Sequence, residues 1–198
     1  MFKLSRLGEL RSGFQLRGAA KHTEDGVHTV IQLGDARDTG IDMSRLIRMN
    51  LDRARERDFV SSGDILLRAR GASYRACLVN DCLPQTVATA PLFVFRLNRR
   101  DALPPYLVWY INRPEVQGIL AGFAHGSYIP TVSIEVFAEL DIFLPPLDVQ
   151  RQIVEVDALT QQEKALSARL AEERERLAQA LLERLLISYK QRGDDHEG

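Results

Sequence analysis

The residues of this sequence that are best suited to chemistry lie in a short stretch between positions 68 and 75. Arg68, Arg70 and Arg75 carry guanidinium groups, Tyr74 carries an aromatic ring, and Gly71 allows the backbone to turn between them. A guanidinium group donates paired hydrogen bonds to guanine edges and to phosphates, so arginine is favoured at nucleic-acid contacts. The stretch therefore predicts a nucleic-acid-binding surface, with an ordinary exposed loop as the alternative interpretation.

Two other polar loops contain side chains of a similar kind. His125, Ser127 and Tyr128 lie together in one loop, and we expect them to belong to the same reading surface. Arg17 and Lys21 lie in another loop, and we expect them to contact phosphates rather than bases. Each loop taken alone is equally well explained as solvent-exposed chain without a function.

The sequence does not contain a motif that predicts catalysis. A phosphate-binding P-loop, a nucleophile elbow and a zinc-protease motif are all absent from it. The segment Leu103-Pro104-Pro105-Tyr106 is similar to the catalytic box of amino-methyltransferases, but the Leu103 side chain cannot accept a hydrogen bond from an amino group. Two prolines at the start of a helix explain this segment better, and we expect no catalytic residue in the chain.

The distribution of metal-binding residue types predicts neither a metal nor a cofactor. The histidines and cysteines occur singly, without the spacing of a ligand set: His22, His28, His125, His196, Cys77 and Cys82. Unpaired thiols are typical of a reducing compartment. No apolar run approaches the roughly 18 residues of a membrane span, and no signal peptide is recognisable, so we expect a cytoplasmic protein.

Charge is nearly balanced over the whole chain but differs between its two parts. The formal net charge is -1, with 18 basic against 16 acidic residues up to position 147, and 8 against 11 beyond it. Arginine makes up all but four of the 26 basic residues. This preference suits contacts to nucleic acid, and it equally suits ion pairs in proteins of a GC-rich genome.

The elements that must position these loops indicate an α+β fold with one mixed α/β domain over residues 1–147. Alternating and β-branched segments predict strands within 27–33, 65–70, 76–79, 86–97 and 141–144. Proline pairs and capping residues predict short helices at 104–111, 115–120 and 133–140. We expect the irregular segments between them to form the loops described above.

The last quarter of the chain predicts one long helix over residues 148–190, followed by a disordered tail at 191–198. This segment is rich in Ala, Leu, Glu, Gln and Arg, and it has no Pro or Gly until Gly193. Five apolar positions follow the seven-residue spacing of a coiled coil: Val156, Leu159, Leu166, Leu170 and Leu177. Leu181 begins a wider stripe after them. Glu163 and Glu173 fall on positions of the same seam, so the heptad pattern is imperfect. We expect the helix to pair with another helix, because the preceding domain is too short to cover it. The alternative is an amphipathic helix that folds back on its own domain.

The order of several segments resembles the specificity subunits of type I restriction-modification systems. The resemblance is carried by Ser62-Gly63-Asp64-Ile65-Leu66, by the helix from Pro105 to Ile111, and by the Gly126-Ser127 loop. Its most specific part is Ile142-Phe143-Leu144-Pro145-Pro146-Leu147-Asp148-Val149-Gln150-Arg151-Gln152-Ile153, which looks like the family's junction between target recognition domain and helix. The resemblance implies a target recognition domain followed by a coiled-coil helix.

The resemblance also implies a division of labour between subunits. A protein of this kind binds double-stranded DNA and is not catalytic, while methyltransferase subunits that use S-adenosylmethionine, and possibly a restriction subunit, act at the site. Members of the family commonly carry two recognition domains and two helices, whereas this sequence holds one of each. We therefore expect a half-length subunit whose antiparallel homodimer recognises a bipartite target. The alternatives are a stand-alone dimeric DNA-binding regulator or anti-restriction protein, and a structural scaffold whose domain binds protein.

Overall fold

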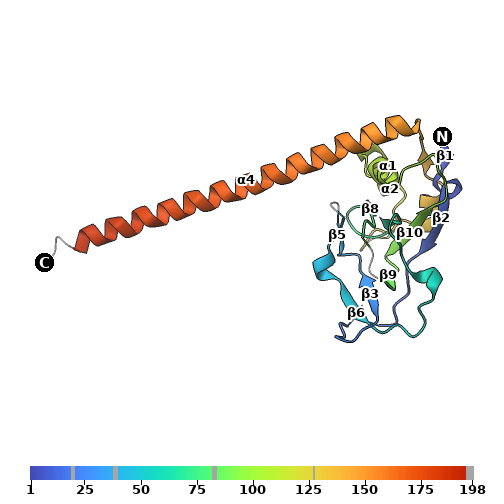
Figure 1. Ribbon diagram of the computed structural model, residues 1–198, viewed down its shortest axis with the longest axis horizontal. Helices are drawn as coiled ribbons and strands as arrows, with labels where there is room; N and C mark the ends of the chain where they lie inside the picture. The colour runs from blue at the N-terminus through green and yellow to red at the C-terminus, as the bar shows by residue number, and fades with distance from the viewer. Residues whose placement is uncertain (19–20, 38–39, 82–83, 127, 195–198) are drawn as a thin grey trace. The chain divides into compact units, whose positions relative to one another are not determined.

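The structure is a computed structural model, and it describes residues 1–18, 21–37, 40–81, 84–126 and 128–194, with side chains as far as residue 186. Contacts divide the chain into two units, Met1–Val154 and Glu155–Gly198. The first unit combines β-sheets with three short helices, and the second continues one long helix (Figure 1). The fold class predicted from the sequence is confirmed.

The main sheet of the first unit has the strand order β2-β10-β7-β8, with every neighbouring pair antiparallel. These strands span Gly8–Ser12 (β2), Leu92–Leu97 (β10), Ile65–Arg68 (β7) and Ala76–Leu78 (β8). The central strand β10 consists largely of the aromatic and aliphatic residues that suit a sheet buried on both faces. Its pairing with β7 places Arg68 opposite Leu92, at the end of the ladder.

A second sheet has the strand order β6-β3-β9, with β3 antiparallel to β6 and parallel to β9. Its strands span Ile47–Met49 (β6), His28–Ile31 (β3) and Thr86–Ala88 (β9). Two smaller antiparallel pairs complete the strands, β4 (Ala36–Arg37) with β5 (Gly40–Ile41) and β1 (Phe2–Lys3) with β11 (Asp141–Ile142). Three single 3-10 turns lie at Leu4–Arg6, Met43–Arg45 and Glu56–Asp58.

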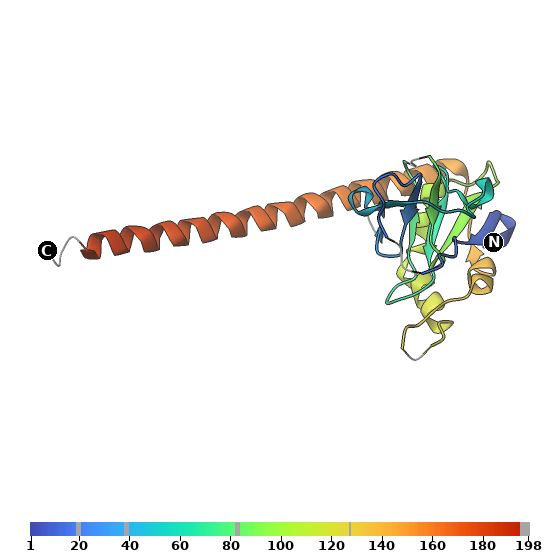
Figure 2. The same ribbon diagram turned by 90° about the horizontal axis from the view of Figure 1, so that it is seen from below.

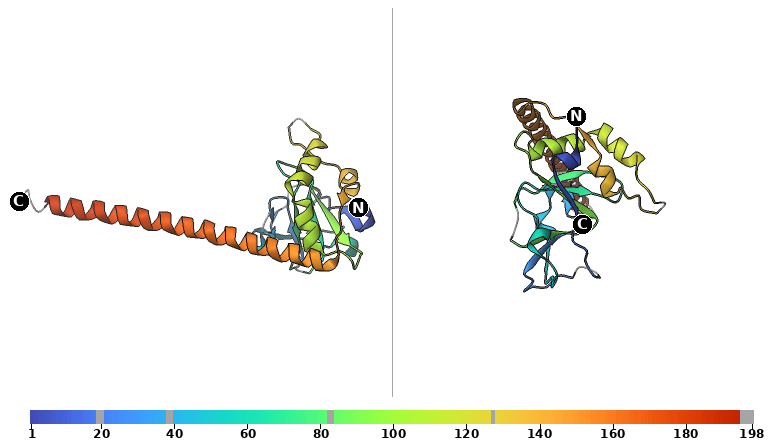
Figure 3. Two further views of the ribbon diagram at one scale, coloured as in Figure 1. Left: turned by 90° about the horizontal axis from the view of Figure 1, so that it is seen from above. Right: turned by 90° about the vertical axis from the view of Figure 1, so that its right-hand side faces the viewer.

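Three helices pack on the main sheet at the face opposite the second sheet. They are α1 (Pro104–Ile111), α2 (Pro114–Gly122) and α3 (Ile134–Ala138). Figures 1 and 3 show α1 and α2 on one side of the main sheet and β3 with β6 on the other. Each helix starts where the sequence predicted a proline or a capping residue to start it.

The two faces of the main sheet bury two separate clusters of apolar side chains. Along β7, Ile65 and Leu67 face the cluster that contains the helices, while Leu66 faces the cluster that contains the second sheet. Phe95 and Val94 divide in the same way along β10. This alternation follows from the two-residue period of a strand, and it makes the main sheet the middle layer of the unit.

Two amide side chains cover the open edge of β8. Asn112 at the end of α1 accepts a hydrogen bond from Ala76 N (2.8 Å) and donates one to Ala76 O (2.9 Å). Gln117 in α2 makes the same pair of hydrogen bonds with the backbone of Tyr74, both at 3.1 Å. The amides satisfy the backbone groups that a further strand would otherwise pair with. As a result, the segment that leads from β7 to β8 is held against the helices.

The long helix α4 extends from Leu147 to Asp194 without a break (Figure 3). Its first two turns belong to the first unit, because Ile153 and Val154 pack against the main cluster and Gln150 is fully buried. The predicted boundary at residue 147 therefore marks the start of the helix, while the contact boundary lies between Val154 and Glu155. The helix also continues past its predicted end at Lys190, so residues 191–194 are helical rather than part of a disordered tail. Residues 195–198 lie outside the described chain.

Candidate nucleic-acid interface

The continuation of β7 brings two of the predicted loops together. Val132 N donates to Ala69 O at 2.8 Å, and Gly71 N donates to Pro130 O at 3.1 Å, so that Arg70 pairs with Thr131. Thr131 in turn exchanges two backbone hydrogen bonds with His125, at 2.9 and 3.0 Å. These bridges join the chain around position 70 to the chain around position 128, although nearly 60 residues separate them in the sequence. Figure 2 shows the yellow segment after α2 extending away from the sheets.

A groove of about 630 Å³ connects this strand pair to the segment that follows β2. Its lining includes six residues with polar side chains: Arg70, Gln15, Gln32, Ser12, Thr89 and Thr131. Guanidinium groups contact guanine bidentately and amide side chains contact adenine in the same way. The groove therefore gathers the two side-chain types that distinguish purine bases in the DNA major groove.

A second groove of about 560 Å³ lies on the other side of the same segment. The two grooves share Gln15, Leu16 and Gly18, while Arg17 and Arg53 line the second one together with the acidic Asp52. Both arginines are exposed, which suits contacts to the phosphate backbone. The segment from 14 to 18 thus places a cationic side chain next to the groove that holds Arg70.

Most of the predicted contact residues lie at the surface of the first unit. Arg17, Lys21, Arg70 and His125 are exposed, and Tyr128 is 94% exposed. Arg68 and Arg75 are partly buried where β7 ends and β8 approaches. Ser127 lies outside the described residues.

Tyr74 is the predicted contact residue that the structure contradicts. Its side chain is only 4% exposed and packs in the main apolar cluster. Tyr74 N donates to the Gln117 side chain and Tyr74 O accepts from it, and these two hydrogen bonds hold this position against α2. An aromatic ring buried in this way cannot stack on a base, so Tyr74 does not belong to the candidate interface.

Arg68 has an unusual environment. Its Nε atom is buried and has no hydrogen-bond partner among the described residues. A buried donor without a partner destabilises a fold by about 1–3 kcal/mol, and such groups are accordingly rare. Arg68 and Arg70 are two residues apart on one extended segment, so both project to the same face. Because Arg68 projects to the same face as Arg70, it lies at the edge of the candidate interface.

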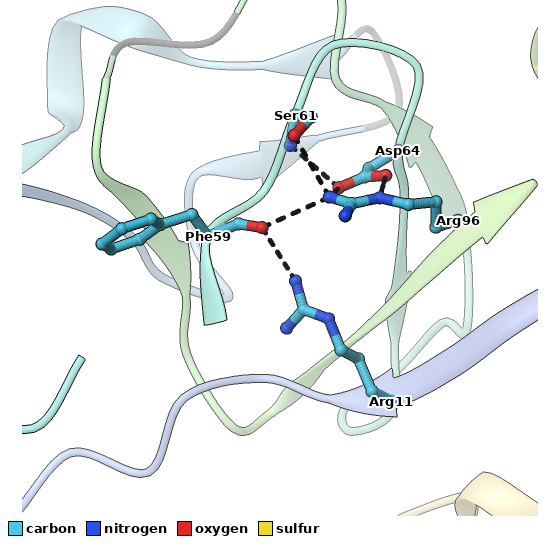
Figure 4. Close-up of polar contacts among 5 residues, drawn as sticks. All are labelled: Arg11, Phe59, Ser61, Asp64 and Arg96. Carbon is cyan, nitrogen blue, oxygen red and sulfur yellow. Dashed lines mark hydrogen bonds and ion pairs between the residues drawn. The ribbon is translucent and has the colours of Figure 1, made fainter. Parts of the chain in front are cut away.

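An ion pair between a buried aspartate and a partly exposed arginine positions the strand that leads to these arginines. Asp64, whose side chain is 2% exposed, accepts two hydrogen bonds from Arg96, at 2.8 and 2.7 Å (Figure 4). Arg96 also donates to the Ser61 hydroxyl at 3.1 Å and to Phe59 O at 3.3 Å, and Arg11 donates to the same carbonyl at 3.1 Å. The network ties the turn before β7 to β10 and β2.

The network also gives two arginines of this unit a structural role. The hydrogen bonds with Asp64 raise the pKa of Arg96 above its ordinary value, whereas burial lowers the pKa of Arg11. Both guanidinium groups donate to the Phe59 carbonyl, and Arg96 also holds Asp64 and Ser61. Asp64 belongs to the Ser62-Gly63-Asp64 segment of the family resemblance, and here its role is to fix the turn before β7.

The sequence did not single out two amide side chains that line the first groove, namely Gln15 and Gln32. Gln15 lies in the predicted loop with Arg17, so its position was foreseeable from the sequence. Gln32 follows β3 and reaches the groove only because the second sheet packs next to the main one. Within the described residues, no cluster of side chains is suited to hold a metal ion, and no helix is both long and apolar enough to span a membrane.

In the second unit, the apolar positions of α4 form an exposed stripe. The side chains of Val156, Leu159, Leu166, Leu170, Leu177 and Leu181 are between 52% and 63% exposed. Isolated exposed leucines are common on protein surfaces, but a continuous row at coiled-coil spacing is typical of a helix–helix interface. The predicted stripe is therefore present, and no described residue of the chain covers it.

Comparisons with known proteins identify the fold. No protein-family model matches the sequence, and a search of curated proteins found no match. Among solved structures, the HsdS subunit from Thermoanaerobacter tengcongensis superposes with a TM-score of 0.61 and 20% identity, over 86% of this chain and 44% of that one. A structure from work on the assembly and conformational transition of the type I R-M system gives a TM-score of 0.59 and 22% identity, over 86% and 40%. The type I restriction-modification S subunit from M. genitalium gives 0.57 and 13%, over 81% and 38%.

The chain spans less than half the length of each of these structures. At identities of 13–22% the similarity concerns the fold, and it includes most of the described chain. The resemblance predicted from the sequence is confirmed at this level. This chain therefore has the fold of the specificity subunits of type I restriction-modification systems.

Proposed function

We propose that this chain is a DNA-reading specificity component of a type I restriction-modification complex. The observation that carries the proposal is the convergence of three predicted loops on adjoining grooves, in a chain with the fold of HsdS subunits. The first unit would read one half of a bipartite target, and α4 would join it to the unit that reads the other half. The chain itself would not catalyse a reaction.

In this proposal the groove that contains Arg70 faces the bases. Arg70 would donate two hydrogen bonds to the O6 and N7 atoms of a guanine, and Gln15 or Gln32 would pair with an adenine. Arg17, Arg53 and Lys21 would contact phosphates on either side and set the register along the duplex. His125 and Tyr128 would contact the DNA next to Arg70, because the Thr131 bridges hold their loop there.

Pairing through α4 accounts for recognition of two half-sites. A second copy of the chain, with its helix antiparallel, would bury the exposed apolar stripe and supply an inverted copy of the reading surface. A helix of this length extends roughly 60–70 Å, which is about two turns of duplex DNA. Several unread base pairs would then separate the two half-sites.

Modification and cleavage would be carried out by partner subunits. A methyltransferase subunit that uses S-adenosylmethionine would dock on the paired helices, and a restriction subunit would join the same assembly. A stand-alone dimeric regulator would have the same reading surface without these partners. Co-purification of the chain with the methyltransferase from its native cells supports the first function, and recovery of the chain alone supports the second.

The reading function is tested by selecting binding sites from randomised duplexes with the full chain and its Arg70→Ala variant. We expect the variant to lose preference at one base position of each half-site, by about 1–3 kcal/mol for a bidentate guanine contact. Arg100→Ala is the matched control, because Arg100 is an exposed arginine outside both grooves. An unchanged selection with Arg70→Ala would exclude this residue from base reading, and the absence of DNA binding by the full chain would refute the function.

A further inference from the structure

The exposed stripe of α4 contains charged residues whose positions are related to those of its leucines. At 100° per residue, the stripe lies within about 40° of the direction of Leu170, and besides the apolar side chains it includes a pair of charged residues, Glu163 and Arg184, with Arg174 midway between them. Within the described part of the helix both charged residues are exposed. Glu163 accepts only a short-range hydrogen bond from Ser167 on its own helix, at 3.0 Å. The seam thus has an acidic position, Glu163, towards one end, a basic position, Arg184, at the other end, and Arg174 near the middle.

Apart from Arg174 at the centre, the spacing along this seam from Glu163 to Arg184 is symmetric. From Glu163 the positions 166, 170, 177, 181 and 184 follow at intervals of 3, 4, 7, 4 and 3 residues. Read in the opposite direction, the intervals are the same, with the acidic and basic ends exchanged. A helix with this pattern is complementary to a second, antiparallel copy of the same helix, so a second copy of this chain can serve as its partner.

We propose that two copies of α4 pair antiparallel about a two-fold axis between Glu173 and Arg174, with Glu163 of each helix opposite Arg184 of the other. The proposal rests on the pairing through α4 proposed above, and it specifies its register. In this register Leu166 lies opposite Leu181 and Leu170 lies opposite Leu177. The layers formed by positions 166, 170, 177 and 181 then join two leucines each, and Glu163 and Arg184 neutralise each other. Val156 and Leu159 lie outside these layers.

Neighbouring registers lack this match. A shift of one heptad in one direction places Glu163 opposite Leu177, and a shift in the other direction places Arg184 opposite Leu170. A parallel pair in register places the two Glu163 residues opposite each other, and likewise the two Arg184 residues, and like charges in contact are destabilising. At the axis, Glu173 lies opposite Arg174, while within its own helix it pairs with Arg176 at 2.5 Å. Charge therefore selects both the orientation and the register of the helices.

Charge reversal tests the register with the full chain. Glu163→Arg and Arg184→Glu should each raise the dimer dissociation constant by about 10- to 30-fold, because two like-charge contacts replace two ion pairs in each dimer. The double variant should return to within about threefold of the original value, since the pairs are restored in reverse. Glu175→Arg is the matched control, because residue 175 points away from the seam. Sedimentation equilibrium measures all four.

Crosslinking tests the orientation independently. In a Cys82→Ser background, a short bismaleimide should join two chains that carry both Leu166→Cys and Leu181→Cys, and it should not join chains that carry either substitution alone. If each single variant crosslinks, the helices are parallel and the proposal is refuted. A dimer without rescue in the double charge variant refutes the register but leaves the proposed pairing intact. A chain that stays monomeric at micromolar concentration refutes both.

Discussion

The replacement of Gln150 by leucine is predicted to destabilise the first unit strongly. Gln150 is fully buried at the start of α4, where its Oε1 accepts from Leu103 N at 2.9 Å. Its Nε2 donates to Asp101 O and Pro145 O, both at 2.8 Å. One side chain thus joins the loop before α1 to the turn before α4. Leucine has a similar size but cannot form any of these three hydrogen bonds.

The size of the effect follows from these contacts. Each hydrogen bond contributes about 0.5–1.5 kcal/mol, and a backbone group left buried without a partner costs more. Since solvent reaches part of this loop, we expect the free energy of unfolding to fall by about 2–4 kcal/mol. In a unit of this size such a loss lowers Tm by roughly 5–15 °C.

The measurement can be restricted to the first unit. Trp109 is the single tryptophan of the chain and lies in α1, with its ring 5.6 Å from that of Tyr106. Urea unfolding followed by tryptophan fluorescence therefore reports the unit that contains Gln150, and not residues 155–194 of α4. Gln152→Leu is the matched control, because Gln152 lies on the same turn of the helix and is exposed. Equal unfolding midpoints for the two variants would show that the three hydrogen bonds do not hold the junction.

Three further changes test other parts of the structure. Tyr74→Ala should lower the free energy of unfolding by about 3–5 kcal/mol, because it removes a ring from the main cluster. Urea unfolding measures this change, and a variant as stable as the original chain would contradict the burial of Tyr74. Arg17→Ala should weaken DNA binding equally for all sequences and reduce the slope of log K against log salt by about 1, as measured by fluorescence anisotropy. Burial is the main cause that raises the pKa of Tyr106 to about 12, and the neighbouring Tyr110 adds to this shift. The Tyr106 hydroxyl donates to Phe143 O at 2.7 Å. The folded state therefore holds this proton more tightly than the unfolded state, so stability is complete below pH 10 and is lost as pH rises from about 10 to 12. Tyr106→Phe should flatten that loss in urea titrations, and an unchanged pH profile would assign it to another group.

Elements with strong local signals were predictable from the sequence. Proline pairs start α1 and precede α4, the alternation around Val30 identifies β3, and the aromatic and β-branched run around Val94 identifies β10. These signals act over a few residues, so they require no knowledge of the rest of the chain. The short strands between positions 36 and 49 escaped prediction, because two or three residues are too few to show a period.

Tyr74 and Tyr128 show where local reasoning fails. Both are tyrosines in polar, glycine-bearing loops, and the same composition supported a contact role for each. One is 4% exposed and the other 94% exposed. The difference arises because α2, more than 40 residues further along the chain, places Gln117 against the backbone of Tyr74. Burial of this kind depends on contacts between distant segments, and loop composition does not encode it.

The sequence by itself determined the long helix, its seam of leucines and the symmetric placement of Glu163 and Arg184, because helical periodicity relates residues three and four apart. It also determined which loops carry arginine. Only the tertiary structure decided that Arg70 and His125 share one edge through Thr131, that Gln32 joins them, and that Arg96 is occupied by Asp64. Those relations depend on strand order and on the packing of two sheets, which arise from contacts across the whole first unit.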